Sequence, residues 1–300
     1  MLQFFEDITA TRPRIEEAIR KFGYAPEHNF DWYRFSADPK EKNIFVSSDQ
    51  GGGLMTMLGK TNATVFSSPI APPERRAKIL IEYLEEMFCN PEIKKVEFEL
   101  ETPLRREFLK ILPVAFMARS INFTLTWPIM NMKTFDPALP GGHYKYLRKE
   151  KNGFYREHAV TVEDAKTFED KAGLRRIVDD WRKKRTALDR AWYDEYYNII
   201  DGNFAGTDTA RVFLVDGKPT GINAGWMIPN SERFYGAIGL HDYSWPELGD
   251  MLYLEDLKYL KSHGYGEVDM AGSWHGLLDF KKKFLPESYY KTHVFSVVRK

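Results

Sequence analysis

Apolar and polar positions along the chain repeat first with the period of strands and then with that of helices. Four short strands are predicted early in the chain, at about residues 31–36, 43–48, 54–58 and 63–68. A helix follows them, because Leu80, Leu84, Met87 and Phe88 recur at helical spacing. A strand at 96–100, a helix at 104–112 and a long strand at 121–132 come next.

The rest of the chain repeats this order of elements. It begins with a basic helix near 143–151 and a long helical stretch at about 163–200. A hairpin across Asp216-Gly217 follows, since this dipeptide favours the tight turn that joins antiparallel strands. Strands at 233–241, 266–270 and 289–298 then alternate with two helices, one beginning after Ser244 and one at 274–284.

A shift of 173 residues aligns the two parts of the chain with each other. Residues 73–113 then match residues 246–286 at eight of 41 positions, and the turn and helix signals coincide as well. A period this long indicates a duplicated domain rather than a solenoid repeat. We therefore expect an α+β protein whose two domains, 1–138 and 139–300, each contain a mixed, mostly antiparallel sheet with flanking helices.

Composition limits the classes of function. The 43 basic residues balance the 43 acidic ones, so any preference for a charged partner has to come from local patches. The single cysteine excludes an internal disulfide and fits a reducing compartment. The longest apolar run has eight residues, far below the ~20 of a membrane span. We expect a cytoplasmic protein without a transmembrane segment, with contact to a membrane surface left open.

The sequence contains none of the common metal-binding motifs. It has no pair of cysteines, no HExxH motif and no two histidines at helical i, i+4 spacing. We therefore expect no metal site and no permanently bound cofactor.

Two segments carry a resemblance to a known family. YKYLRKEKNGF at 144–154 and LEDLKYLKSHGYGEVDMAGSWHGLLDFKKKFLP at 254–286 resemble the tandem GNAT-fold family related to the catalytic domain of phosphatidylglycerol lysyltransferases. The duplicated order of elements also resembles the Fem-type aminoacyl-tRNA-dependent transferases. The resemblance implies two tandem GNAT-like acyltransferase domains. It also implies a donor site where two parallel strands, here 233–241 and 266–270, part from each other.

The loop at 241–250 bears on the identity of the donor. In GNAT enzymes that use acetyl-CoA, a glycine-rich loop and a helix N-terminus hold the pyrophosphate. This loop has no such glycine pattern and no basic residue, and Ser244 and Glu247 have the spacing of a capping box that would occupy the helix N–H groups. The resemblance then implies aminoacyl-tRNA as donor and an amine or hydroxyl acceptor on a lipid headgroup, peptide or metabolite. Acyl-CoA with an atypical donor loop is the alternative.

Such a transfer needs a group that stabilises the oxyanion and a group that accepts a proton. Lys281 is the leading candidate for contact with a phosphate or oxyanion, because it aligns with Phe108 in the first repeat and so is specific to the second. His241 and Asp242, at the end of a predicted strand, are the acid–base candidates. The donor- or substrate-binding candidates are Lys283, Asp269, Ser273, Trp274, Arg148, Lys149 and Lys151. Structural alternatives are solvated lysines on a helix surface and turn or N-cap duty for Asp269 and Ser273.

Basic residues interleaved with aromatic ones suggest tRNA as a partner. Arg148, Lys149 and Lys151 lie in one such segment, and 182–185 forms a second basic run. If both lined one surface, they would follow a nucleic-acid backbone; two solvated helix faces are the simpler alternative. A third interpretation is a catalytically silent protein that only binds RNA or a protein partner.

Overall fold

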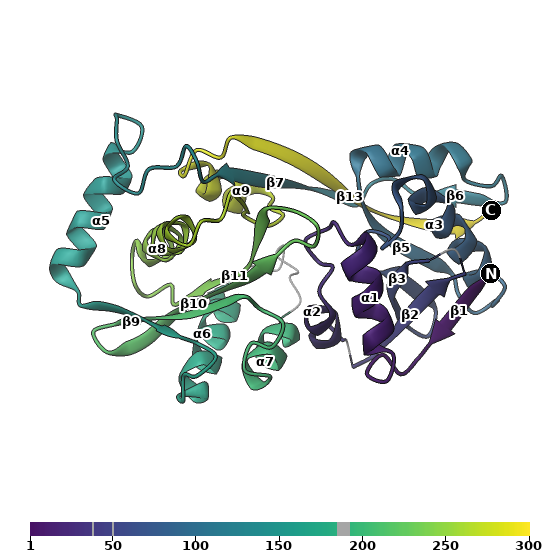
Figure 1. Cartoon of the computed structure of the whole chain (residues 1–300), viewed down its shortest axis with the longest axis horizontal. Helices are drawn as coiled ribbons and strands as arrows, with labels where there is room; N and C mark the ends of the chain where they lie inside the picture. The colour runs from purple at the N-terminus through teal and green to yellow at the C-terminus, as the bar shows by residue number, and fades with distance from the viewer. Residues whose placement is uncertain (38, 50, 185–192) are drawn as a thin grey trace.

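The computed structural model describes residues 1–37, 39–49, 51–184 and 193–300. Within them, thirteen strands form one continuous twisted sheet with helices on both faces (Figure 1). The strands are β1 (Leu2–Phe5), β2 (Lys42–Ser48), β3 (Gly53–Leu58), β4 (Asn62–Val65), β5 (Lys95–Glu101), β6 (Phe116–Ala118), β7 (Phe123–Asn131), β8 (Val160–Asp164), β9 (Thr209–Val215), β10 (Lys218–Met227), β11 (Arg233–His241), β12 (Glu267–Asp269) and β13 (Ser288–Arg299). Their order across the sheet is β1-β2-β3-β4-β5-β13-β7-β12-β11-β10-β9-β8, with β6 paired to β13.

Helices cover the sheet from both sides. They are α1 (Arg12–Phe22), α2 (Phe30–Phe35), α3 (Pro73–Met87), α4 (Thr102–Ile111), α5 (Lys145–Glu157), α6 (Lys171–Lys184), α7 (Asp194–Asp201), α8 (Leu248–Ser262) and α9 (His275–Lys282). None of the helices in the described ranges combines the length and the apolar character that crossing a membrane requires.

The predicted duplication of an α+β unit is confirmed. In the first unit β2, β3 and β4 are antiparallel, α3 follows, and β5 pairs in parallel with β4 before α4. In the second unit β9, β10 and β11 are antiparallel, α8 follows, and β12 pairs in parallel with β11 before α9. Each unit thus contains one parallel strand pair bridged by a helix.

The two units exchange their last strands. β7, which follows the first unit in the chain, pairs with β12 of the second, and β13 at the C-terminus pairs with β5 of the first. β7 and β13 also pair with each other and run side by side between the two ends of the molecule (Figure 1). We refer to residues 1–138 and 139–300 as the N-terminal and C-terminal halves. That predicted boundary stays a prediction, and hydrogen bonds of the sheet cross it.

Three local predictions were wrong. The segment at 31–36 is helix α2, not a strand, because the Asn29 side chain accepts a hydrogen bond from the Trp32 N–H and caps a helix rich in aromatic residues. Helix α5 continues through Asn152 and Gly153 to Glu157. The stretch predicted as helical at about 163–200, with a possible break at Gly173, contains the end of β8 and, among the described residues, helices α6 and α7; Gly173 lies within α6.

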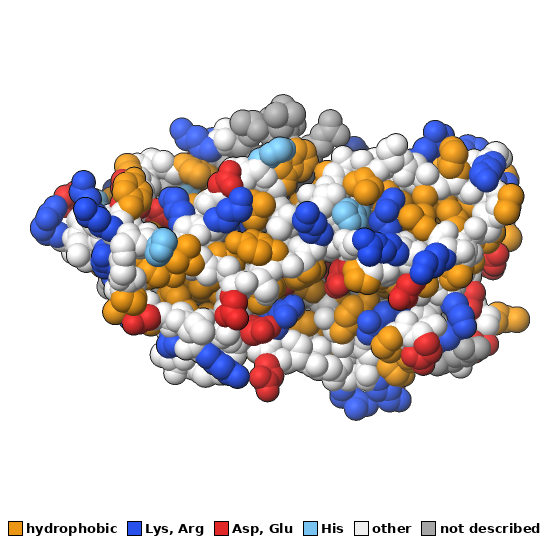
Figure 2. Space-filling model, turned by 90° about the horizontal axis from the view of Figure 1, so that it is seen from above, with side chains coloured by type: hydrophobic (Ala, Val, Ile, Leu, Met, Phe, Trp, Pro, Cys, Tyr) orange, Lys and Arg blue, Asp and Glu red, His pale blue; other side chains and the backbone are white. Residues whose placement is uncertain are grey.

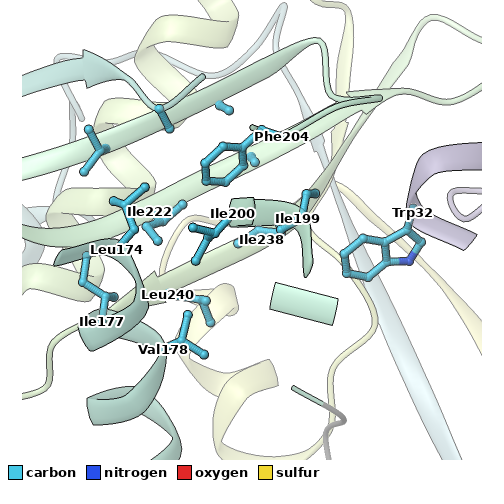
Figure 3. Packing of buried hydrophobic residues seen from close by; sticks show 14 of the residues in the cluster. Trp32, Leu174, Ile177, Val178, Ile199, Ile200, Phe204, Ile222, Ile238 and Leu240 are labelled. Atoms are coloured by element: carbon cyan, nitrogen blue, oxygen red, sulfur yellow. The ribbon is translucent and has the colours of Figure 1, made fainter. Parts of the chain in front are cut away.

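The two halves share a hydrophobic core. Trp32 of α2 packs against the cluster that α6, α7 and the C-terminal part of the sheet form, which includes Ile199 and Ile238 (Figure 3). Its ring lies 5.6 Å from that of Trp226 in β10. The Trp226 indole N–H also donates to the Pro26 carbonyl at 2.7 Å. The loop at 23–29 and α2 of the N-terminal half therefore cover one face of the C-terminal part of the sheet.

Candidate active site between the two halves

Alternate residues of neighbouring strands point to one face at the centre of the sheet. Tyr235 of β11, Asp269 of β12 and Ile129 of β7 lie opposite one another in register, and Tyr290 of β13 lies opposite Trp127 of β7. Because paired residues share a face and side chains alternate along a strand, all five project to the same side. This is the face that the loop at 23–29 covers.

Asp269 is fully buried in this face and strongly hydrogen-bonded. The Tyr290 hydroxyl donates to its Oδ2 at 2.8 Å, and the Ala271 N–H donates to its Oδ1 at 2.9 Å. Burial raises the pKa of the carboxyl to about 6, although both hydrogen bonds favour the charged form. At neutral pH Asp269 is therefore ionised and still basic enough to accept a proton.

A second hydrogen-bonded chain runs beside this pair. The Trp127 indole N–H donates to Thr292 Oγ1 at 2.8 Å, and Thr292 Oγ1 donates to Glu99 Oε1 at 2.5 Å. The ring of Trp127 stacks on that of Tyr290 at 5.4 Å. Burial raises the pKa of Glu99 as well. Acidic side chains of β5 and β12 therefore lie beside aromatic side chains of β7 and β13.

Two further carboxylates approach from the elements that cover this face. Glu195 of α7 is 8% exposed, its Oε2 has no hydrogen-bond partner, and burial raises its pKa to about 7. Glu27 lies in the covering loop and is partly accessible to solvent; its pKa is raised first by burial and then by the charges of Glu99, Glu195 and Asp269. We call these four residues the acidic cluster. Within the described ranges, no basic side chain forms an ion pair with any of the four.

A cleft of about 210 Å³ opens beside the cluster, between the two halves. Tyr24, Pro26 and Glu101 of the N-terminal half line it together with Arg233 and Tyr290 of the C-terminal half. Tyr290 thus borders the cleft and hydrogen-bonds to the carboxylate behind it. Arg233 forms an ion pair with Glu267 of β12, and its guanidinium nitrogen lies 2.8 Å from Glu267 Oε2.

The strands of the parallel pair part at this point. β11 and β12 are paired only over residues 233–235 and 267–269, and β11 has a bulge against β10 directly after Tyr235. On the opposite face of the sheet α8 fills the gap, where side chains such as Tyr253 and Leu257 leave a cavity of about 20 Å³. The cavity between β11 and β12 on the side of α8 therefore has room for roughly one water molecule.

Three of the residues predicted for the site come together at the end of β12. Lys281 is 2% exposed, and its ammonium donates to the carbonyl oxygens of Met270 and Ala271, the latter at 3.1 Å. Burial lowers the pKa of Lys281 to about 7, while the charge of Asp269 acts in the opposite direction. The Ser273 hydroxyl donates to the Ala271 carbonyl at 3.0 Å. Lys281 and Ser273 thus fix the segment that follows Asp269.

The other predicted residues of this half lie elsewhere. His241 ends β11 six residues beyond Tyr235, on the order of 20 Å along the strand, and Asp242 follows directly after the strand. Burial lowers the pKa of His241 to about 4, so its imidazole is neutral at pH 7. Lys283 pairs with the buried carboxylate of Asp250 at 2.9 Å.

Trp274 is 40% exposed and packs on Phe123, with 5.9 Å between ring centroids. It lies directly before α9, on the outer surface rather than in the acidic cluster.

The predicted capping box at Ser244 and Glu247 was wrong. Helix α8 begins at Leu248, Glu247 occupies the N-cap with φ of 62°, and no side chain caps the helix. The left-handed conformation of Glu247 turns the chain into the helix and takes its carboxylate out of capping geometry. The first turn of α8 therefore lacks the side-chain acceptors that the sequence suggested.

The basic helix α5 lies at one end of the molecule, where several Lys and Arg side chains gather (Figure 2). Arg148 donates to the carbonyls of Leu139 and Gly141, the latter at 2.7 Å, and so ties the preceding segment to the helix. Lys149 is exposed and Lys151 half-buried, and neither has a carboxylate partner in the part of the chain that the structure describes. In the second basic run, Arg185 lies outside the described residues.

The sequence alone did not identify Glu27, Glu99, Glu195 and Tyr290. Glu99 lies in the predicted strand at 96–100, where acidic and apolar residues alternate, a pattern typical of a strand with one side facing solvent. In the structure β13 pairs with the edge of this strand, and Glu99 is half-buried and accepts a hydrogen bond from Thr292 of β13. The sequence offered one signal for a buried acidic site. It was the row of acidic residues on one side of this strand, in a chain with a duplicated domain.

Comparison with solved structures places this arrangement in a known fold. No protein-family model and no curated protein sequence matches the chain. The C-terminal domain of a putative lysylphosphatidylglycerol synthetase from Agrobacterium fabrum is 15% identical, with a TM-score of 0.67 over 97% of this chain and 92% of that one. FemX is 10% identical, with a TM-score of 0.65 over 98% and 96% of the two chains. A tandem GNAT protein from the clavulanic acid biosynthesis pathway is 13% identical, with a TM-score of 0.59 over 99% and 98%.

These similarities confirm, at the level of the fold, the resemblance to lysyltransferase-related and Fem-type proteins. At sequence identities this low, the similarities show only that the folds are alike. The chain is an α+β protein with the tandem GNAT fold.

Proposed function

We propose that this protein transfers an aminoacyl group from aminoacyl-tRNA to an amine or hydroxyl of an acceptor, in the cleft between its two halves. The observation that carries the proposal is the Asp269–Tyr290 pair. A buried carboxylate with a pKa of about 6 accepts a hydrogen bond from a tyrosine that borders the cleft. Such a group matches the proton acceptor that this chemistry needs near neutral pH.

The reaction can be written with this pair as the base. The acceptor nitrogen or oxygen attacks the ester carbonyl of the donor, a bond to the carbonyl carbon forms, and the bond to the ribose oxygen of the tRNA breaks. The acceptor loses a proton to the Tyr290 hydroxyl as that hydroxyl passes its own proton to Asp269. The released ribose oxygen takes up a proton from Tyr290, which regains one from Asp269, so that both groups return to their starting state. Lys281 and Ser273 act as positioning residues, because they hold the backbone that follows Asp269.

Two features favour aminoacyl-tRNA as the donor. The gap between β11 and β12 on the α8 side is too small for the arm of an acyl-CoA. Lys149 and Lys151 of α5 also offer cations that no described carboxylate neutralises. A fold shared with a putative lysylphosphatidylglycerol synthetase domain and with FemX is consistent with this class of donor.

An acyl-CoA donor remains the second candidate, and one observation favours it. The first turn of α8 has no side-chain cap, so its N–H groups offer a positive helix end to a pyrophosphate. The tandem GNAT protein of similar fold is described in relation to AcCoA. In this case the acceptor chemistry at Asp269 and Tyr290 would be unchanged.

Binding measurements separate the two donors. Purified protein is titrated with mixed aminoacyl-tRNA, with the same tRNA after deacylation and with acetyl-CoA, each over a series of salt concentrations. We expect tight binding of charged tRNA that weakens steeply with salt and weakens on deacylation. Replacing Lys149 and Lys151 together by Ala is expected to reduce the salt slope by about one to two, at ~0.7–0.9 per phosphate contact.

The control is Lys133→Ala, a change at an exposed lysine outside α5. Binding of acetyl-CoA with indifference to tRNA would overturn the choice of donor. Affinity for tRNA that is flat across the salt series would overturn it as well.

A further inference from the structure

β7 and β13 form an exposed stretch of sheet between α4 and α9, on the side opposite to the acidic cluster (Figure 1). Tyr289, Lys291 and His293 alternate along β13 and project to this side, because the residues between them face the acidic cluster. Tyr289 and Lys291 are exposed, and His293 is half-buried. Together with Thr124 and Thr126, which lie opposite His293 and Lys291 on β7, we call these residues the β13 platform.

His293 connects the platform to α4. Its Nδ1 lies 2.8 Å from Thr124 Oγ1 and its Nε2 lies 2.9 Å from Thr102 Oγ1 of α4, both within hydrogen-bond distance. Arg105, three residues further along α4, lies over the ring of Phe295 at 4.9 Å. Phe295 follows His293 on the same side of β13, so Arg105 borders the platform beside His293.

The platform carries positive charge that the described residues do not neutralise. They contain no carboxylate that is ion-paired with Arg105 or Lys291, and Arg105 Nε has no hydrogen-bond partner among them. Burial lowers the pKa of His293, and the charges of Arg105 and Lys291 lower it further. Figure 2, which views the molecule from this side, shows a His beside several Lys and Arg side chains.

Acidic side chains of the neighbouring elements project away from the platform. Glu99 and Glu101 of β5 are paired with residues of β13 that face the acidic cluster. Glu107 follows Arg105 by two residues, about 200° around α4, and so lies on the far side of that helix. The charge of this surface therefore complements an anionic partner.

An exposed tyrosine gives the platform an aromatic ring for stacking. Tyr289 is 46% exposed, and it also lines the cleft of about 210 Å³ that Tyr290 borders. Sheet faces that combine exposed aromatic rings with basic side chains suit single-stranded nucleic acid, because bases stack on the rings while cations hold the phosphates.

We infer that the β13 platform, with Arg105, binds single-stranded RNA, and that this RNA is the unpaired 3′ end of the donor tRNA. Naming the RNA as tRNA rests on the proposed function, whereas the platform lies outside α5 and adds a second contact. Tyr289 belongs both to the platform and to the lining of the cleft. A strand that follows β13 from His293 to Tyr289 therefore brings its 3′ end, which carries the aminoacyl ester, to Tyr290.

The test measures binding of a fluorescein-labelled RNA octamer ending in CCA to the full protein, by fluorescence anisotropy over a series of salt concentrations. The same octamer annealed to its complement as a blunt duplex is the second probe, and we expect the single strand to bind more tightly. Lys291→Ala should weaken binding and reduce the salt slope by about 0.7, the value for one phosphate contact of a single strand. Tyr289→Ala should weaken binding about tenfold through lost stacking, whereas Tyr289→Phe keeps the ring and should keep the affinity.

Lys60→Ala, at an exposed lysine in the turn between β3 and β4, is the matched control and should leave the affinity unchanged. Unchanged affinity in both Lys291→Ala and Tyr289→Ala would overturn the inference, as would equal affinity for the single strand and the duplex. Binding to phosphatidylglycerol vesicles that depends on Lys291, without binding of the octamer, would overturn it as well and assign this surface to a membrane.

Turnover separates this inference from the proposed function. If the wild-type protein transfers aminoacyl groups from tRNA, and Lys291→Ala and Tyr289→Ala both keep its KM for tRNA, the inference fails and the proposed function stands. If the octamer binds as expected but no aminoacyl-tRNA supports transfer, the proposed function is refuted and the platform remains a surface for single-stranded RNA.

Discussion

Among single residues, Tyr290 occupies the position on which the proposed chemistry depends, and its neighbour provides a natural control. Tyr289 and Tyr290 both line the cleft, but only Tyr290 hydrogen-bonds to Asp269. We expect Tyr290→Phe to lower the rate of aminoacyl transfer to ethanolamine by about 100-fold or more, the scale of general-base catalysis. Donor affinity should change little, whereas the free energy of unfolding should fall by about 1–3 kcal/mol, because the buried Asp269 Oδ2 loses its hydrogen-bond donor. Tyr289→Phe should retain most of the rate; equal rates in the two variants would exclude Tyr290 as the proton relay.

Burial of Glu195 makes stability depend on pH. Its pKa in the folded protein is about 7, above the value in the unfolded chain, so folding favours the protonated form. The favourable contribution is complete at low pH and is lost as the pH rises through about 7. We expect Glu195→Gln to stabilise the protein at pH 8 by up to about 3 kcal/mol, at ~1.4 kcal/mol per pKa unit, and much less at pH 5. Urea unfolding at the two pH values measures this, and a gain that is equal at both would contradict the burial argument.

Lys281 distinguishes a positioning role from direct contact with the donor. Its ammonium supplies hydrogen bonds to two buried carbonyls, of Met270 and Ala271. Lys281→Met should therefore lower the free energy of unfolding by about 1–3 kcal/mol, the cost of buried acceptors left unpaired. The exposed neighbour Lys282 is the control, and Lys282→Met should change stability little. If Lys281→Met kept full stability and lost donor binding, the phosphate or oxyanion contact suggested by the sequence would be favoured instead.

Among the secondary-structure elements, β13 has the widest structural role. It is the last strand of the chain, yet it lies between β5 and β7 and so joins the sheets of both units. A fragment of residues 1–138 would leave β5 and β7 without this partner. We expect that fragment alone to show no cooperative unfolding transition, and the pair of fragments 1–138 and 139–300 to assemble into a folded complex when expressed together. Cooperative folding of 1–138 alone, measured by circular dichroism on heating, would show that the predicted domain boundary marks an independent unit.

The helices and strands also show which parts of the fold can be predicted from the sequence. Periodicity located the helices α3 and α8 and most strands, because each buries one face against a single core. It failed at α2, where aromatic residues with strand propensity follow an asparagine cap.

The acidic cluster was beyond the reach of local patterns. Glu99 alternates with apolar residues as a solvent-facing strand residue would, and Glu27 lies in a loop. Their burial results from the exchange of strands and from the covering loop, which bring together residues about 170 positions apart or more, as in the contact of Trp226 with Pro26.

In the whole molecule, the active-site proposal depends on how the halves are held together, and one hydrogen bond tests this. The Trp226 indole N–H donates to the buried carbonyl of Pro26, the residue before Glu27, at 2.7 Å. Trp226→Phe keeps an aromatic ring against Trp32 but leaves that carbonyl unpaired, which should cost about 1–3 kcal/mol of stability. Because the sheet is continuous through β7 and β13, we expect a single unfolding transition at lower temperature rather than two separate ones. Trp245→Phe, a change at a ring that contacts His158 near α5, is the control. Two separate transitions would show that the halves unfold independently once this contact is lost, and unchanged stability would show that the contact does not hold them together.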